Sequence, residues 1–200
     1  MITATDAPVE QASARSFSRA DARRNHDDVF AAAVAVFAER GLEATIPEIA
    51  ARAGVGKATV YRSYPTKAAL VDAVADAQLK WLEARVQSAD AEADPFEALA
   101  ALLGDIAQRL AQDRLFSHTL ARTRAERAER ADDATIPSIL AAAQRQGRIR
   151  ADATAQDIQV LVGGFSRILL DMGIHDPAVW RRYTTLVLLA LRPDPEPEDH

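Results

Sequence analysis

Several side chains with a clear chemical use lie close together in the first third of the chain. Lys57, Ala58, Tyr61 and Arg62 fall on or near one face if their segment is helical. Small and polar side chains with positive charge and a phenol suit a helix that enters a DNA major groove, where base edges and phosphates lie within reach. The pattern therefore predicts contact with double-stranded DNA.

Two short helices joined by a tight turn would position these side chains. Thr45 can cap the first helix, and Glu48 follows it at the three-residue spacing of a capping box. Gly54 can adopt a positive φ and end that helix sharply. In the second helix Val60 and Tyr64 fall four residues apart and can pack inward, which leaves the polar side chains on the open face.

Further helices are predicted on both sides of this pair. One begins at Lys67 with Thr66 as its cap, and its free N–H groups beside a lysine make a phosphate site. Another is expected from about Asn25 to Arg40, because Val29 and Phe37 share an apolar stripe. This earlier helix would cover the pair and fix its angle.

The same region resembles a known family at many spaced positions. They are Ala32, Ala33, Phe37, Gly41, Thr45, Ile49, Ala50, Ala53, Gly54, Val55, Thr59, Tyr61, Tyr64, Lys67 and Leu70. Together, over about residues 24–72, they resemble the DNA-binding domain of TetR/AcrR transcriptional regulators. The chain departs from the usual family pattern at Gly56, where Ser is common, and at Tyr64, where Phe is common.

The resemblance implies which residues contact DNA. They are Thr45, Lys57, Ala58, Thr59, Tyr61, Arg62, Tyr64 and Lys67. Lys57 suits guanine and the Ala58 methyl suits thymine, while Arg62 either reads a base or holds a phosphate. The other hydroxyl and ammonium groups contact phosphates, with two positions open: Thr59 contacts a base or packs, and Tyr64 contacts a phosphate or lies in the core.

Composition narrows the class of protein. The 200 residues include no Cys, which excludes disulfides and thiolate sites. The first residues carry acids and no apolar segment, so no signal peptide is expected, and the longest apolar run, Leu186–Leu191, is too short to cross a bilayer. We therefore expect a cytoplasmic location and no membrane partner.

The net charge of −5 is unusual for a DNA-binding protein. Residues 1–67 hold nine Arg and Lys against eight Asp and Glu, so few placed phosphate contacts are expected rather than a broad basic surface. The N-terminal arginines Arg15, Arg19, Arg23 and Arg24 either reach a minor groove or belong to a solvated terminus.

The predicted fold is all-α, with about nine helices. We expect a disordered arm over residues 1–20, a helix-turn-helix DNA-binding domain over 21–66, an effector-binding and dimerisation domain over 67–192, and a disordered tail over 193–200. The helix that begins at Lys67 would run to about Ser88 and join the two domains as one rod.

The last two predicted helices are apolar on more than one side, which requires two packing partners. A homodimer that forms a four-helix bundle meets this need, and the resemblance implies the same pairing. Gly163 and Gly164, in the middle of the first of these helices, indicate close approach of another helix. The expected dimer residues are Leu161, Phe165, Leu169, Trp180, Tyr183 and Val187.

The resemblance also implies a small-molecule effector in the second domain. Candidate lining residues are Trp81, Phe96, Leu99, Leu103, Phe116, His118, Leu120 and Phe165, each of which is either pocket wall or ordinary core. Because few of them are polar, a mainly apolar ligand is expected. By the family mechanism its binding would shift the helix that begins at Lys67 and release a palindromic operator from a dimeric repressor.

Signals for other chemistry are weak. A phosphate-binding P-loop requires Gly where Ala51 stands, and Ser or Thr where Ala58 follows the lysine. The four histidines, His26, His118, His175 and His200, lack paired metal-ligand spacing, and the sequence contains no HExxH motif. We therefore predict no enzyme, no metal site and no cofactor.

Three functions remain open. The first is a ligand-released dimeric repressor, and the second is a DNA-binding regulator or architectural protein without an effector. The third is a helical interaction or catalytic module with a vestigial helix-turn-helix. A cavity within residues 75–175 separates the first two, and a DNA-binding assay separates the third.

Overall fold

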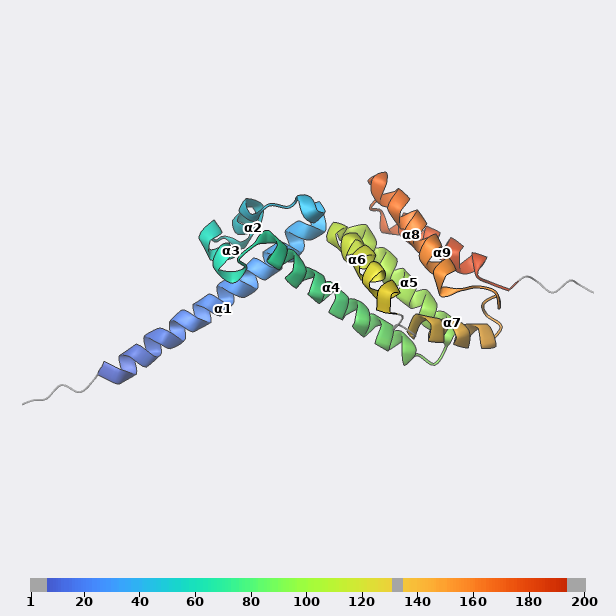
Figure 1. Cartoon of the computed structure of the whole chain (residues 1–200), viewed down its shortest axis with the longest axis horizontal. Coiled ribbons are helices and arrows are strands. Elements are labelled where there is room, and N and C mark those ends of the chain that lie inside the picture. The colour runs from blue at the N-terminus through green and yellow to red at the C-terminus, as the bar shows by residue number, and fades with distance from the viewer. Residues whose placement is uncertain (1–6, 131–134, 194–200) are drawn as a thin grey trace, which may run out of the picture. The chain divides into compact units, whose positions relative to one another are not determined.

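The computed structural model describes residues 7–130 and 135–193, with side chains over 21–123 and 136–193, and every regular element in these ranges is helical (Figure 1). The helices are α1 (Ala7–Arg40), a 3-10 turn η1 (Gly41–Glu43), α2 (Ile46–Ala53), α3 (Lys57–Ser63), α4 (Lys67–Asp90), α5 (Pro95–Gln112), α6 (Arg114–Arg130), α7 (Thr135–Arg145), α8 (Ala155–Asp171) and α9 (Pro177–Ala190). This confirms the predicted all-α class.

The chain divides into two compact units, Met1–Val74 and Ala75–His200, so it passes from one unit to the other within α4. None of the helices in the described ranges combines the length and the hydropathy that crossing a bilayer requires.

Helix α1 begins much earlier than its predicted start near Asn25. Residues 7–20, predicted as disordered, are helical here, and residues 1–6 and 194–200 lie outside the described ranges. The early start follows from composition: alanine recurs through this segment together with Gln, Glu and Arg, all strong helix formers. Apolar periodicity, on which the predicted boundary rested, begins only where α1 meets its neighbours at Val29.

In the first unit α1 packs across α2 and α3. Val29, Phe37, Ile49, Val60 and Leu70 are fully buried and form its core. Burial of a side chain of this size contributes about 1.5–3 kcal/mol, so a few such residues hold the short helices α2 and α3 in place.

The turn between α2 and α3 has the predicted geometry. Gly54 has φ +67°, a conformation that glycine adopts without strain. Its N–H donates to the carbonyl of Ala51 at 3.2 Å, and the N–H of Val55 donates to that of Ala50 at 3.0 Å. These two bonds define a Schellman motif, which ends α2 and directs the chain into α3.

In the second unit α5 is the central helix and contacts α6, α7, α8 and α9. Its apolar side is buried along its whole length, and Phe116 of α6 and Trp180 of α9 pack into the same core. The Trp180 indole Nε1 donates to the carbonyl of Ile174 at 2.8 Å, so this buried polar atom is satisfied.

Candidate nucleic-acid interface and effector cleft

The exposed face of α3 carries the predicted reading side chains. Lys57, Ala58, Tyr61 and Arg62 are exposed, and Tyr61 is 49% accessible despite its apolar ring. Val60 is fully buried on the opposite side, as the helical spacing predicts. The structure therefore brings these four side chains together on one open surface.

The start of α3 depends on backbone hydrogen bonds. The Gly56 cap is extended, with φ −76° and ψ 153°, and its carbonyl accepts the N–H of Thr59 at 2.9 Å. Because glycine has no hydroxyl, no side chain caps this end. Of the first N–H groups of α3, those of Thr59 and Val60 donate to the Gly56 carbonyl, so the backbone alone ends the turn into α3.

Arg62 folds back along α3 instead of extending into solvent. Its Nε donates to the carbonyl of Ala58 at 3.3 Å, and a terminal nitrogen donates to the Thr59 hydroxyl at 2.9 Å. The half-buried Thr59 thus positions the Arg62 guanidinium. This role differs from both predicted alternatives, which were packing and a direct base contact.

Thr45 and Lys67, both predicted to contact DNA phosphates, form hydrogen bonds within the first unit. The Thr45 N–H and hydroxyl donate to the Glu48 carboxylate at 2.8 and 2.7 Å, in the predicted capping box. These bonds, aided by the charges of Arg40 and Lys67, lower the pKa of Glu48 below its usual range. The Lys67 Nζ donates to the Leu42 carbonyl at 2.5 Å, which anchors it beside the start of α4.

Tyr64 belongs to the core rather than to the DNA surface. It is only 8% exposed, and its ring stacks on that of His26 with 4.9 Å between the centroids. Its hydroxyl lies 3.1 Å from Nε2 of His26, and burial, with a smaller effect of Asp27, raises the pKa of the phenol. Of the two alternatives for Tyr64, its burial and its engaged hydroxyl favour the core over a phosphate contact.

Family models match both parts of the chain. The model described as bacterial regulatory proteins, tetR family, matches residues 29–74, and the model of the SbtR-like transcriptional regulator C-terminal domain matches residues 94–193. The second match alone covers half of the chain. The chain belongs to the TetR family.

Individual TetR-family proteins resemble the chain to different extents. The HTH-type transcriptional repressor KstR2 of Mycobacterium tuberculosis is 34% identical over 114 residues, which cover 48% of this chain and 57% of the relative. The match thus spans little more than half the length of that relative.

Two solved structures are similar over more of their length. A TetR transcriptional regulator from Streptomyces coelicolor, SCO0520, is 30% identical, with 85% of this chain and 99% of that chain covered and a TM-score of 0.61. A TetR transcription regulatory protein from Mycobacterium vanbaalenii is 38% identical, with 77% and 97% covered and a TM-score of 0.53.

The predicted effector residues of this TetR-family chain do not gather around one cavity. Phe96, Leu99, Leu103 and Phe116 are buried in the core of the second unit, where they leave no surface for a ligand. Trp81 packs edge-on against Phe116, with 5.6 Å between their ring centroids. Apolar character alone therefore identified core residues rather than a pocket wall.

A cleft of about 520 Å³ opens instead between α6 and α8. Two predicted residues, the exposed His118 and the half-buried Leu120, line it. The other lining residues are Leu110, Arg114, Ser117, Ala121, Val162, Gly163, Ser166, Arg167, Leu170 and Asp171. Most of these polar side chains were not predicted, because α6 and α8 lie far apart in sequence.

A buried polar cluster joins α4 to the start of α6. Gln78 Nε2 donates to the Asp113 carboxylate at 2.8 Å, and the Thr119 hydroxyl donates to Gln78 Oε1 at 2.6 Å. The same carboxylate accepts the N–H groups of Leu115 and Phe116, both at 3.1 Å, and so caps α6. We refer to Gln78, Asp113 and Thr119 as the polar cluster.

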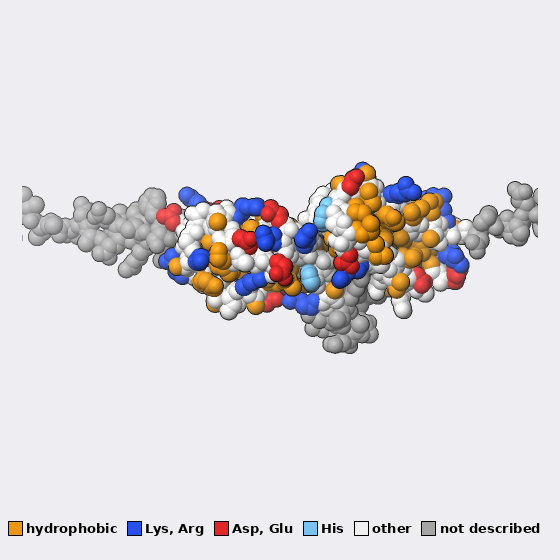
Figure 2. Space-filling model, turned by 90° about the horizontal axis from the view of Figure 1, so that it is seen from above, with side chains coloured by type: hydrophobic (Ala, Val, Ile, Leu, Met, Phe, Trp, Pro, Cys, Tyr) orange, Lys and Arg blue, Asp and Glu red, His pale blue; other side chains and the backbone are white. Residues whose placement is uncertain are grey.

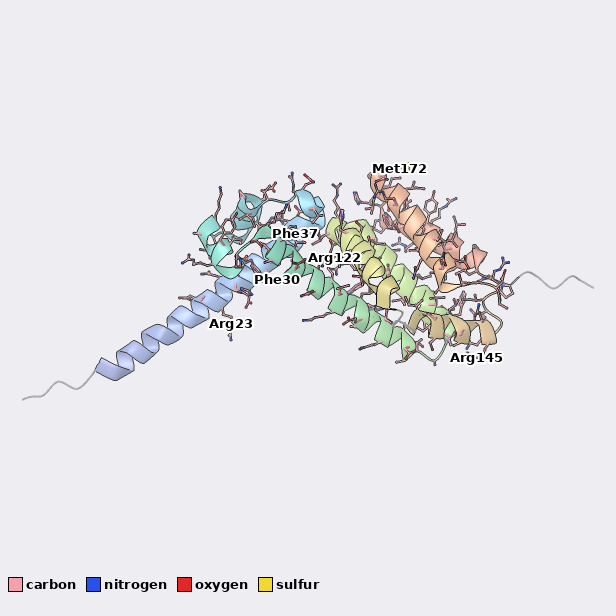
Figure 3. The ribbon with its side chains drawn as sticks, viewed as in Figure 1. Arg23, Phe30, Phe37, Arg122, Arg145 and Met172 are labelled. Carbon is pink, nitrogen blue, oxygen red and sulfur yellow. The ribbon has the colours of Figure 1, made fainter. Side chains whose placement is uncertain are left out.

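The outer face of α8 and α9 carries exposed apolar side chains (Figure 2). They are Val160, Leu161, Ile168, Met172, Tyr183, Leu186 and Leu189. Met172 lies at the C-terminal end of α8 (Figure 3). A Cβ added to Gly164 on this helix would meet no atom of the described residues within 4 Å, so the packing inside the described part of the chain does not require glycine there.

Several predicted dimer residues face inward instead. Leu169, Trp180 and Val187 are buried within their own chain, and Trp180 is only 1% exposed. Phe165 is half-buried and stacks on Tyr183, with 5.8 Å between the centroids. Of the predicted set, Leu161 and Tyr183 lie on the exposed apolar face.

Proposed function

We propose that the protein is a dimeric transcriptional repressor that binds a near-palindromic DNA operator and releases it when a small molecule binds in the second unit. The observation that carries the proposal is the exposed α3 surface of Lys57, Ala58, Tyr61 and Arg62 beyond a tight Schellman turn. Such a short, rigidly mounted helix with exposed small and cationic side chains suits a major groove.

Dimerisation supplies the second recognition helix. The exposed apolar side chains of α8 and α9 form a face that water does not solvate well, and an isologous contact between two copies would cover it. Two α3 helices would then contact successive major grooves about 34–36 Å apart.

The effector step rests on the cleft and on the connectivity of α4. A molecule bound between α6 and α8 can act on α6, whose start is fixed to α4 by the polar cluster. Because α4 continues into the first unit, a change in its position reaches the DNA-binding helices. The molecule weakens operator binding only if it binds the released conformation more tightly.

Selection of bound fragments from a randomised DNA library tests the proposal. We expect an inverted repeat to be enriched, and light scattering to show a dimer both free and on the DNA. A monomer in solution, or enrichment of no symmetric sequence, would contradict it. The cleft favours this function over a DNA-binding regulator without an effector.

A further inference from the structure

The α6–α8 cleft contains a buried hydroxyl without a partner. Ser166 is 4% exposed and lines the cleft, and its Oγ makes no hydrogen bond to any described residue. A buried polar atom left in this state destabilises a protein by about 1–3 kcal/mol, so native structures rarely retain one without a use.

The other buried helical hydroxyls of the second unit are satisfied. Thr123 and Thr184 each donate to the carbonyl four residues earlier, at 2.9 and 3.0 Å, and Thr119 donates to Gln78 Oε1 in the polar cluster. Ser166 could make the equivalent bond but does not. Its hydroxyl therefore keeps an unused hydrogen-bonding capacity in the wall of the cleft.

The charged groups around the cleft favour an anion. Arg114 and Arg167 line it together with one acid, Asp171, and with His118. Asp171 accepts a hydrogen bond from Arg167 Nε at 2.8 Å, so the single negative charge is already paired. The remaining excess of positive charge comes from Arg114, which suits a carboxylate.

Apolar side chains form the rest of the wall. Leu110, Leu120, Val162 and Leu170 contribute from α5, α6 and α8. A cavity of about 520 Å³ falls within the range of about 300–1,000 Å³ that small-molecule sites occupy. The cleft thus combines an apolar wall with a cationic and hydroxyl-bearing edge.

We propose that this cleft binds small amphipathic carboxylic acids, with the carboxylate held by Arg114 and the Ser166 hydroxyl and the hydrocarbon part against the leucines and Val162. This narrows the mainly apolar ligand expected from the sequence to an acid. The binding site stands on its own contacts, whereas the statement that the acid is an effector rests on the proposed function.

A titration of matched acids and amides tests the ligand class. The full chain, with ¹³C-labelled Leu and Val methyl groups, is titrated with octanoate, 4-phenylbutanoate and 3-cyclohexylpropanoate, and with the primary amide of each. We expect at least one acid to bind about tenfold more tightly than its amide, with shifts at Leu120, Val162 and Leu170.

Two substitutions, each with a control, test the proposed contacts of Arg114 and Ser166 with the carboxylate. Arg114→Gln should remove the preference for the acid over the amide, while Arg145→Gln, which changes an exposed arginine on α7 (Figure 3), should leave it intact. Ser166→Ala should weaken acid binding about tenfold and raise the Tm of the free protein, because an unsatisfied hydroxyl is removed. Ser138→Ala, on the exposed side of α7, should change neither.

Three results would overturn the proposal: no acid that binds better than its amide, shifts confined to methyl groups outside the cleft, or a lower Tm in Ser166→Ala. The DNA selection separates this inference from the proposed function. A protein that enriches a palindrome but shows no acid preference loses only the ligand assignment. One that binds acids but enriches no DNA keeps the cleft and loses the repressor function.

Discussion

The α3 surface and the α6–α8 cleft differ in how their polar groups are satisfied. The side chains of α3 are exposed and mounted on a short helix whose buried side is fully packed, so the surface exists before DNA arrives. The cleft instead holds a buried hydroxyl without a hydrogen-bond partner among the described residues. The comparison teaches that one site is preorganised at little cost, because water solvates it, whereas the other carries the cost of an unsatisfied group, which the proposed ligand would satisfy.

The largest effect should come from the polar cluster of the second unit. Asp113→Ala removes the acceptor of Gln78 and the cap of α6, so the free energy of unfolding should fall by roughly 2–4 kcal/mol. Urea denaturation measures this loss. Asp90→Ala, an exposed position at the end of α4, is the matched control and should change little. Equal effects of the two substitutions would show that the cluster contributes nothing beyond surface charge.

On the α3 surface the corresponding change should alter binding instead of stability. Lys57→Ala should reduce the free energy of discrimination at the base that Lys57 contacts by about 1–3 kcal/mol, and so change the sequence preference. Lys67→Ala should weaken binding to all DNA sequences alike. It should also reduce the slope of log affinity against log salt concentration by about 1. Fluorescence anisotropy with the selected operator and its single-base variants measures both, with Lys80→Ala of α4 as the control. An unchanged base preference in Lys57→Ala would remove that residue from the base contacts.

The two units of the chain also differ in how far the sequence predicts them. The Schellman turn, the capping box and the open face of α3 follow from neighbours within a few residues, so local spacing was sufficient. The polar cluster joins Gln78 to Asp113 across 35 positions, and no local pattern marks that pair. Likewise, helical spacing shows that α8 and α9 have two apolar sides, but not that Trp180 faces inward while Leu186 faces outward.

The stacked pair of Tyr64 and His26 in the first unit can be tested through the stability of the protein in alkaline solution. Because burial raises the pKa of the Tyr64 phenol in the folded state, its contribution is complete below the unfolded pKa near 10 and is lost as the pH rises through the folded value. Tyr64→Phe should lower stability by about 1 kcal/mol at pH 7 and flatten the alkaline loss. Thermal unfolding of the substituted and the unsubstituted protein from pH 7 into the alkaline range measures both effects.

The smallest effect is expected at the exposed capping box of α2. Glu48 accepts the Thr45 bonds as a carboxylate, and these bonds hold its pKa below the usual range. Its contribution is therefore present above the unfolded pKa and is lost as the pH falls through the lower folded value. Glu48→Gln should slightly reduce the loss of stability at acid pH. Thermal unfolding between pH 3 and pH 7 measures this loss, because the range spans the ordinary glutamate pKa of about 4.5. Glu43→Gln, in the preceding turn, is the control. A steeper acid limb in Glu48→Gln than in the control would mean that the carboxylate opposes folding, and that the local contacts of α2 are weaker than their short distances indicate.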